Sequence, residues 1–124
     1  MVLQISIILV FSVIFGVSKS ITDISESCFS TSRLKYLSPL FWDKHQSWKN
    51  KWKNRNPKDG ERFLGSSTLL VWITDAWHLF TGLSYIALSI AVAFTQSLFG
   101  VAFIFIPLVI GLLVFEASYR ILKD

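Results

Sequence analysis

Charged residues are scarce over most of this sequence. No Asp, Glu, Lys or Arg occurs from Met1 to Ser18, and Asp75 is the only one between Phe63 and Phe115. Charged residues make up 16% of the 124-residue chain, whereas a soluble domain carries about a quarter. A chain this short has no water-soluble core large enough to bury such runs, so lipid is the medium that suits them.

Cysteine and histidine are scarce too, which limits the chemistry that the chain can carry. The single cysteine, Cys28, excludes an internal disulfide framework, and there are only two histidines. The sequence has no Gly-rich phosphate loop, no His-Glu-x-x-His, no Cys-x-x-Cys and no serine in a glycine elbow. We therefore expect no catalytic residue, no cofactor and no metal site of a known type, and an enzyme acting alone is not expected.

Three apolar stretches predict an all-α integral membrane protein, because about 20 such residues cross a bilayer as a helix. The predicted spans cover about 2–18, 66–94 and 98–122. Only Thr95-Gln96-Ser97 separates the last two, which indicates a helical hairpin with a tight turn. The predicted organisation is a single membrane domain over 1–124: an N-terminal span (1–18), a basic cytoplasmic segment (19–62) and a transmembrane hairpin (63–124). A signal peptide cleaved after Ser20 is the alternative for residues 1–20, but no basic residue precedes the apolar stretch.

The basic segment predicts an amphipathic helix over about 39–54 that lies in the membrane interface. Ser38-Pro39 is typical of a helix start, and Pro57 and Gly60 mark its end. Aromatic residues recur at helical spacing with lysines beside and opposite them, as an interfacial helix requires. The residues that we expect to contact lipid headgroups are Phe41, Trp42, Lys44, Trp48, Lys49, Lys51, Trp52 and Lys53.

The distribution of basic residues predicts the orientation of the spans. Ten of the twelve Lys and Arg residues lie in segment 19–62, none lies in the hairpin turn, and Arg120 and Lys123 are in the C-terminal tail. Cytoplasmic loops carry an excess of Lys and Arg. We therefore expect the N-terminus outside and the large loop and C-terminus inside.

One group of ionisable residues near the spans is a candidate site: Asp75, His78, Glu116 and Arg120. A hairpin that turns near Ser97 brings Asp75 level with Arg120, and His78 level with Glu116. The simplest interpretation is a charge clasp that fixes the hairpin register, since membrane proteins usually pair such charges. The alternatives are a proton or quinone site at His78 and Glu116 and a metal site formed by Asp75, His78 and Glu116, although the ligands are few.

Two segments carry a resemblance to known proteins. They are Pro57-Lys58-Asp59-Gly60-Glu61-Arg62-Phe63 and Thr74-Asp75-Ala76-Trp77-His78-Leu79-Phe80. Together with the residues around them, which include Lys49-Asn50, they resemble a segment of uncharacterised small bacterial membrane proteins and cover about a quarter of the chain. The resemblance implies a bacterial cytoplasmic (inner) membrane and implies no activity.

These observations favour a non-catalytic membrane protein that acts as an accessory subunit or a membrane-anchored interaction module. The expected partners are anionic lipid headgroups and other membrane proteins or further copies of this chain, whereas nucleic acid is not expected. One alternative is a pore-former that resembles three-span phage holins, although the 44-residue basic loop departs from that pattern. The other is a small redox- or proton-linked subunit with its site at Asp75, His78 and Glu116.

Overall fold

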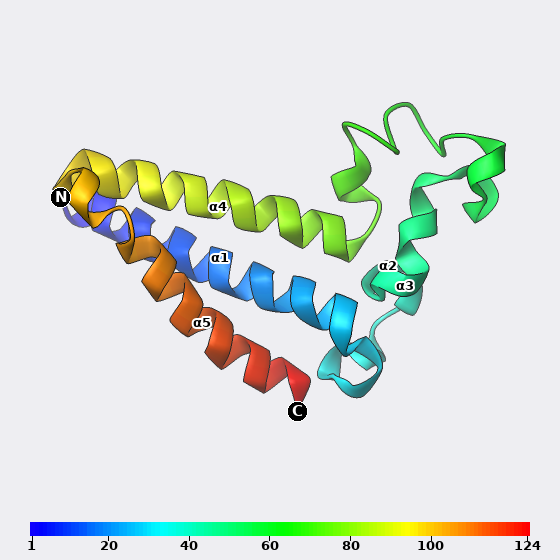
Figure 1. Ribbon diagram of the computed structural model, residues 1–124, viewed down its shortest axis with the longest axis horizontal. Coiled ribbons are helices and arrows are strands. Elements are labelled where there is room, and N and C mark those ends of the chain that lie inside the picture. The colour runs from blue at the N-terminus through cyan, green and yellow to red at the C-terminus, as the bar shows by residue number, and fades with distance from the viewer. The chain divides into compact units, whose positions relative to one another are not determined.

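The structure, a computed structural model, describes all residues from 1 to 124 and is all-α (Figure 1). Three long helices, α1 (Val2–Ser27), α4 (Ala76–Phe99) and α5 (Ile106–Lys123), dominate it. Helices over Val2–Ser27, Ala76–Phe99 and Val101–Lys123 are each long and apolar enough to cross a membrane. The predicted fold class, an all-α membrane protein with three spans, is confirmed.

Short helical turns make up the rest of the regular structure. Two are α-helices of four residues, α2 (Pro39–Trp42) and α3 (Lys44–Ser47). The others are 3-10 helices at Phe29–Thr31, Arg33–Tyr36, Trp48–Lys51, Lys53–Arg55, Pro57–Asp59, Val71–Ile73 and Val101–Phe103.

The chain divides into two compact units that interleave along the sequence. The helical unit contains Met1–Ser20 and Leu83–Ile121, and the loop unit contains Ile21–Gly82 and Leu122–Asp124. Within the helical unit, successive helices run in opposite directions, so the N-terminal end of α1 and the α4–α5 turn lie at the same end (Figure 1).

Helices α1 and α5 approach each other closely within the helical unit. A Cβ atom added at Gly16 would overlap the backbone carbonyl of Gly111 and come within 2.8 Å of the Val114 Cβ. Farther along, the Ser118 hydroxyl donates a hydrogen bond to the Ser20 hydroxyl over 2.9 Å. Small residues that let backbones meet are the usual basis of helix packing in membranes.

Helix α1 extends beyond the span predicted over 2–18. The serine-rich stretch after Ser18, which suggests a linker, continues the helix to Ser27. Two of its hydroxyls donate to carbonyls of their own helix, Ser20 to Val17 and Ser27 to Asp23. These internal bonds satisfy the polar side chains without leaving the helix, so the predicted end was wrong.

Helix α4 begins ten residues later than the span predicted over 66–94. Gly65 has a φ of 79°, and the following residues form turns and a 3-10 helix up to Ile73. The helix proper starts after Asp75, whose side chain accepts a hydrogen bond from the backbone N–H of His78. Asp75 therefore has the position and the bonding of a helix N-cap.

The hairpin turn also lies later than predicted. Thr95, Gln96 and Ser97 belong to α4, and the buried Thr95 hydroxyl donates to the Ala91 carbonyl. The chain turns instead at Gly100, whose φ of 86° is open to glycine at little cost. Pro107, in the first turn of α5, therefore suits a helix start.

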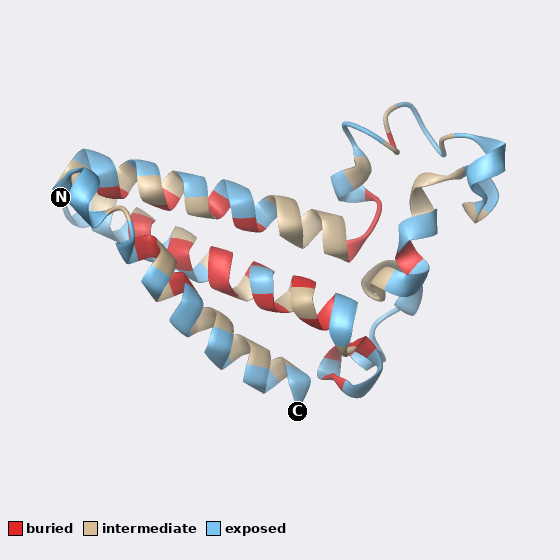
Figure 2. Cartoon of the chain, viewed as in Figure 1, coloured by how far each residue is buried: buried red, intermediate tan, exposed pale blue.

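The buried face of α4 consists of small residues, and Figure 2 shows buried positions along this helix. These residues are Ser84, Ala87, Ala91 and Thr95, spaced three to four apart. This buried face differs from the side of α4 that carries Tyr85, which is 69% exposed.

The interfacial helix predicted over 39–54 is not continuous. Asp43 adopts an extended conformation between α2 and α3, and its side chain accepts a hydrogen bond from the His45 backbone N–H. Trp52 is extended as well, and Asn54 is left-handed. Asp43 therefore ends α2 and caps α3. Short polar side chains interrupt helices in this way, because they form hydrogen bonds to backbone groups in place of the helical ones.

Candidate functional site

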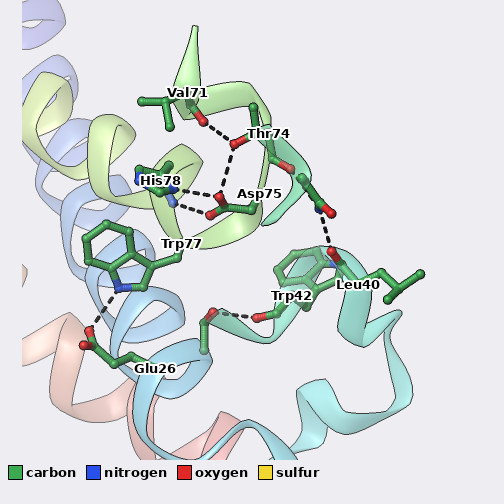
Figure 3. A network of polar contacts seen from close by, with 10 residues as sticks. Glu26, Leu40, Trp42, Val71, Thr74, Asp75, Trp77 and His78 are labelled. Carbon is green, nitrogen blue, oxygen red and sulfur yellow. Dashed lines mark hydrogen bonds and ion pairs between the residues drawn. The ribbon is translucent and has the colours of Figure 1, made fainter. Parts of the chain in front are cut away.

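The N-terminus of α4 carries a buried ionisable pair, Asp75 and the half-buried His78 (Figure 3). One carboxylate oxygen of Asp75 accepts the His78 backbone N–H over 2.9 Å, and the other lies 2.7 Å from His78 Nδ1. The Thr74 hydroxyl donates to that second oxygen over 3.2 Å. Both oxygens of this carboxylate are thus hydrogen-bonded to residues at the start of α4 or directly before it.

The environment of Asp75 favours its charged form. Its side chain is only 1% exposed, and this burial raises the pKa. The hydrogen bonds from the His78 side chain and backbone, the charge of His78 and the Thr74 hydroxyl lower it by more. The net effect is a pKa below the ordinary value, as hydrogen bonds to a carboxylate produce.

The second expected pair, Glu116 and Arg120, closes on the surface of α5. Arg120 Nε lies 2.6 Å from Glu116 Oε1, and both side chains are more than half exposed. The clasp pairs Asp75–Arg120 and His78–Glu116 would join the two units, and they stay a prediction. These pairs were expected for a hairpin that turns near Ser97. The chain turns at Gly100 instead, which shifts the residues of α5 relative to those of α4.

No group of three or more His, Cys, Asp and Glu side chains is placed to hold a metal ion. The metal hypothesis for Asp75, His78 and Glu116 therefore gains no support from the geometry.

Glu26, near the end of α1, is the centre of a second polar cluster in the loop unit. Its carboxylate accepts the Trp77 indole N–H over 3.0 Å and lies 2.5 Å from Lys44 Nζ. The same ammonium group sits 4.0 Å from the centroid of the Trp77 ring, which adds a cation–π contact. His45 Nε2 lies 3.0 Å from the Glu26 carbonyl oxygen. Residues from α1, α3 and α4 thus meet at Glu26, and Figure 3 shows its contact with Trp77.

Further bonds attach α2 to its neighbours within the loop unit. The Ser25 hydroxyl donates to the Trp42 carbonyl over 2.5 Å, and the Trp42 ring packs 5.7 Å from Phe80. The Asn50 amide donates to the carbonyls of Leu40 and Thr74, over 2.6 and 3.1 Å. The basic segment is therefore tied to the ends of two long helices rather than being free.

The residues predicted to contact lipid have different surroundings in the structure, and lipid contact stays a prediction. Trp42 and Phe41 pack against each other, and Lys44 is engaged by Glu26 and Trp77. Trp48 is 40% exposed. Lys49 and Lys53 are exposed as well. Lys51 and Trp52 are half-buried.

Sequence reasoning missed the residues that make these long-range bonds. Glu26 and Asn50 carry no pattern that distinguishes them from other polar residues, and their partners are 10 to 51 positions away. The role of Asp75 as the N-cap of α4 could have been predicted, because Asp75 stands directly before an apolar run, as N-cap residues do.

The comparisons with known proteins add no relative: no protein-family model, no curated protein and no solved structure matches this chain.

Proposed function

We propose that this chain is a non-catalytic membrane protein that works by association, as an accessory subunit or a membrane-anchored interaction module. The observation that carries the proposal is the uncovered surface of α5. Only 11% of the most apolar stretch of the helical segment Val101–Lys123, which contains α5, is buried within the chain. Val109, Leu112 and Leu113 are 56%, 51% and 69% exposed. Helix surfaces of this kind are available to lipid or to other membrane helices.

The polar clusters support a structural role for the ionisable residues. Asp75 directs both oxygens at the first turn of α4 and at Thr74. Glu26 is committed to Lys44 and Trp77. Groups used in this way stabilise the ends of helices and leave little capacity for proton transfer.

We place the loop unit on the cytoplasmic side of a bacterial inner membrane, with the N-terminus outside and the C-terminus inside. Ten of the twelve basic residues belong to segment 19–62, and such residues mark cytoplasmic loops. The exposed Trp48, Lys49 and Lys53 are suited to anionic headgroups, since each basic residue near such a surface contributes about 1 kcal/mol.

Site-specific photo-crosslinking in the native membrane tests association through α5. A benzophenone side chain at Leu113 projects from the exposed surface, and we expect it to form an adduct with a second protein or with another copy of the chain. The same probe at the next residue, Val114, is the matched control, because Val114 faces Gly16 of α1. The probe at Val114 should therefore form a crosslink to α1 of the same chain.

Two outcomes would overturn the proposal. Adducts with lipid alone at both Leu113 and Val109 would mean that α5 faces only the bilayer. Rapid leakage of a small dye from vesicles that contain the purified protein would instead indicate a pore.

A further inference from the structure

Residues 50–62 of the loop unit form a small hairpin with a closed base. Trp52 and Glu61 make an isolated antiparallel β-bridge. The Lys53 N–H donates to the Gly60 carbonyl over 3.0 Å, and the Arg62 N–H donates to the Lys51 carbonyl over 2.9 Å. The bridge therefore brings Arg62 back beside the segment that carries Trp52.

The backbone in this hairpin is strained. Asn54 and Arg55 have φ values of 49° and 58°, two consecutive left-handed residues that are not glycine. The Asn54 amide donates to Asp59 over 3.1 Å, and Arg55 Nη2 donates to the Gln46 carbonyl over 2.7 Å. Strain of this kind persists where surrounding contacts hold it, and it is concentrated at functional sites.

The hairpin borders an open cavity of about 270 Å³ that is lined by polar, cationic and aromatic side chains. The lining residues are Asn50, Trp52, Asn54, Arg55 and Arg62, with no carboxylate among them. The two nearest acids along the chain bind elsewhere. Asp59 accepts from the amides of Asn54 and Asn56, and Glu61 accepts from the backbone N–H groups of Gly65 and Ser67. Neither forms an ion pair with Arg55 or Arg62.

Two of the lining residues carry buried donors that no protein group satisfies. They are the Trp52 indole N–H and the Arg55 Nε–H. A buried donor without an acceptor is costly and rare in native proteins. The Asn50 amide N–H groups are already taken by Leu40 and Thr74. The two residues with unsatisfied donors both belong to the cavity lining, and the charged side chains of that lining, Arg55 and Arg62, are cationic.

We propose that this cavity is a binding site for a phosphate group. Arginine guanidinium groups form charge-assisted, often forked bonds with phosphate oxygens. Arg62 and Arg55 each supply a guanidinium group, and Arg55 Nη2 also donates to the Gln46 carbonyl. The Trp52 indole adds a neutral donor. A phosphate group presents several acceptor oxygens in different directions, which matches donors that come from separate side chains. A lipid headgroup and inorganic phosphate share this chemistry.

The site differs from the general attraction of a basic segment to anionic lipid, because it requires particular donors in one cavity. It also stands apart from the proposed association in the membrane, which depends on α5. The failure of either proposal leaves the other intact.

Titration of the full-length protein in maltoside micelles tests the site. The indole ¹⁵N–¹H resonance of Trp52, assigned by its loss in Trp52→Phe, reports directly on one of the unsatisfied donors. Sodium phosphate, added at constant ionic strength against chloride, should shift this resonance saturably. Arg62→Gln should weaken binding about tenfold, as the loss of a charge-assisted bond does. Arg62→Lys should give an intermediate value, because it keeps the charge and loses the fork.

Lys58→Gln is the matched control, because it removes one positive charge from the same hairpin outside the cavity lining. We expect less than a twofold change. Equal weakening by Lys58→Gln and Arg62→Gln would overturn the proposal, as would a shift that does not saturate. The Lys53 amide resonance, which reports on the hairpin base, shows whether each variant is folded.

A parallel titration with a short-chain phosphatidylglycerol separates the two sources of phosphate. Saturation by both ligands, by the lipid alone or by inorganic phosphate alone each supports the site and identifies what fills it. The absence of saturation with either ligand would refute it.

Discussion

Asp75 performs two tasks with one carboxylate at the start of α4. It accepts the free backbone N–H of His78, which has no partner within the helix, and it binds the His78 ring. Because Asp75 is buried, removal of its side chain also leaves those partners without an acceptor.

We predict that Asp75→Ala lowers the free energy of unfolding by about 1–2 kcal/mol, the usual contribution of a helix cap. Asp75→Asn should lose less, because its amide oxygen still accepts from the His78 backbone. Unfolding of the full chain by SDS in mixed micelles, followed by circular dichroism, measures both losses. Equal losses in the two variants would show that the cap is unimportant and that the charge is decisive.

The same contribution should depend on pH. The pKa of Asp75 in the folded protein lies below its ordinary value of 3.8. The carboxylate therefore stabilises the fold above about pH 3.8, and this stabilisation is lost as the pH falls through the folded pKa. The stability difference between wild type and Asp75→Ala should shrink in acid, as the Asp75 carboxylate becomes protonated.

At the scale of helices, α1 and α5 are held close by the two glycines at their crossing. We predict that Gly16→Ala costs about 1–3 kcal/mol, because the new methyl group overlaps backbone atoms, which cannot rotate away. Gly82→Ala in α4 is the control. Its Cβ meets nothing closer than 3.9 Å, so replacing a helical glycine should be neutral or stabilise the protein by about 0.5–1 kcal/mol.

The same SDS titration measures both glycine variants. If Gly16→Ala were as stable as wild type, α1 and α5 would not pack through this crossing.

The existence of the three long helices was predictable, whereas several of their ends were not. Uncharged runs of sufficient length determine the helices in lipid. The ends depend on local bonds: serine hydroxyls that bond to their own helix extended α1, and Gly100 displaced the predicted turn.

The basic segment was the least predictable part of the chain. Its conformation depends on bonds between distant residues, such as Asn50 to Thr74, and helical spacing of tryptophans gives no information about them. The candidate phosphate site has the same origin, since the Trp52–Glu61 bridge creates it.

At the scale of the whole molecule, the single cysteine offers a direct test of sidedness. We predict that Cys28 in intact spheroplasts resists a membrane-impermeant maleimide and reacts after permeabilisation, because it belongs to the basic segment. In a Cys28→Ser background, Ala102→Cys should react in intact spheroplasts, because Ala102 is exposed in the α4–α5 turn. The reverse labelling pattern would invert the proposed orientation.

The α4–α5 turn has a consequence for how the protein enters a membrane. From Ala76 to Phe115 the chain carries no Asp, Glu, Lys or Arg, and the turn itself exposes Val101, Phe103 and Phe105. Work against a membrane potential is done only on charge, at about 2.3 kcal/mol per elementary charge per 100 mV. Insertion of this hairpin moves no such charge across the bilayer, so an energised membrane neither drives nor resists it.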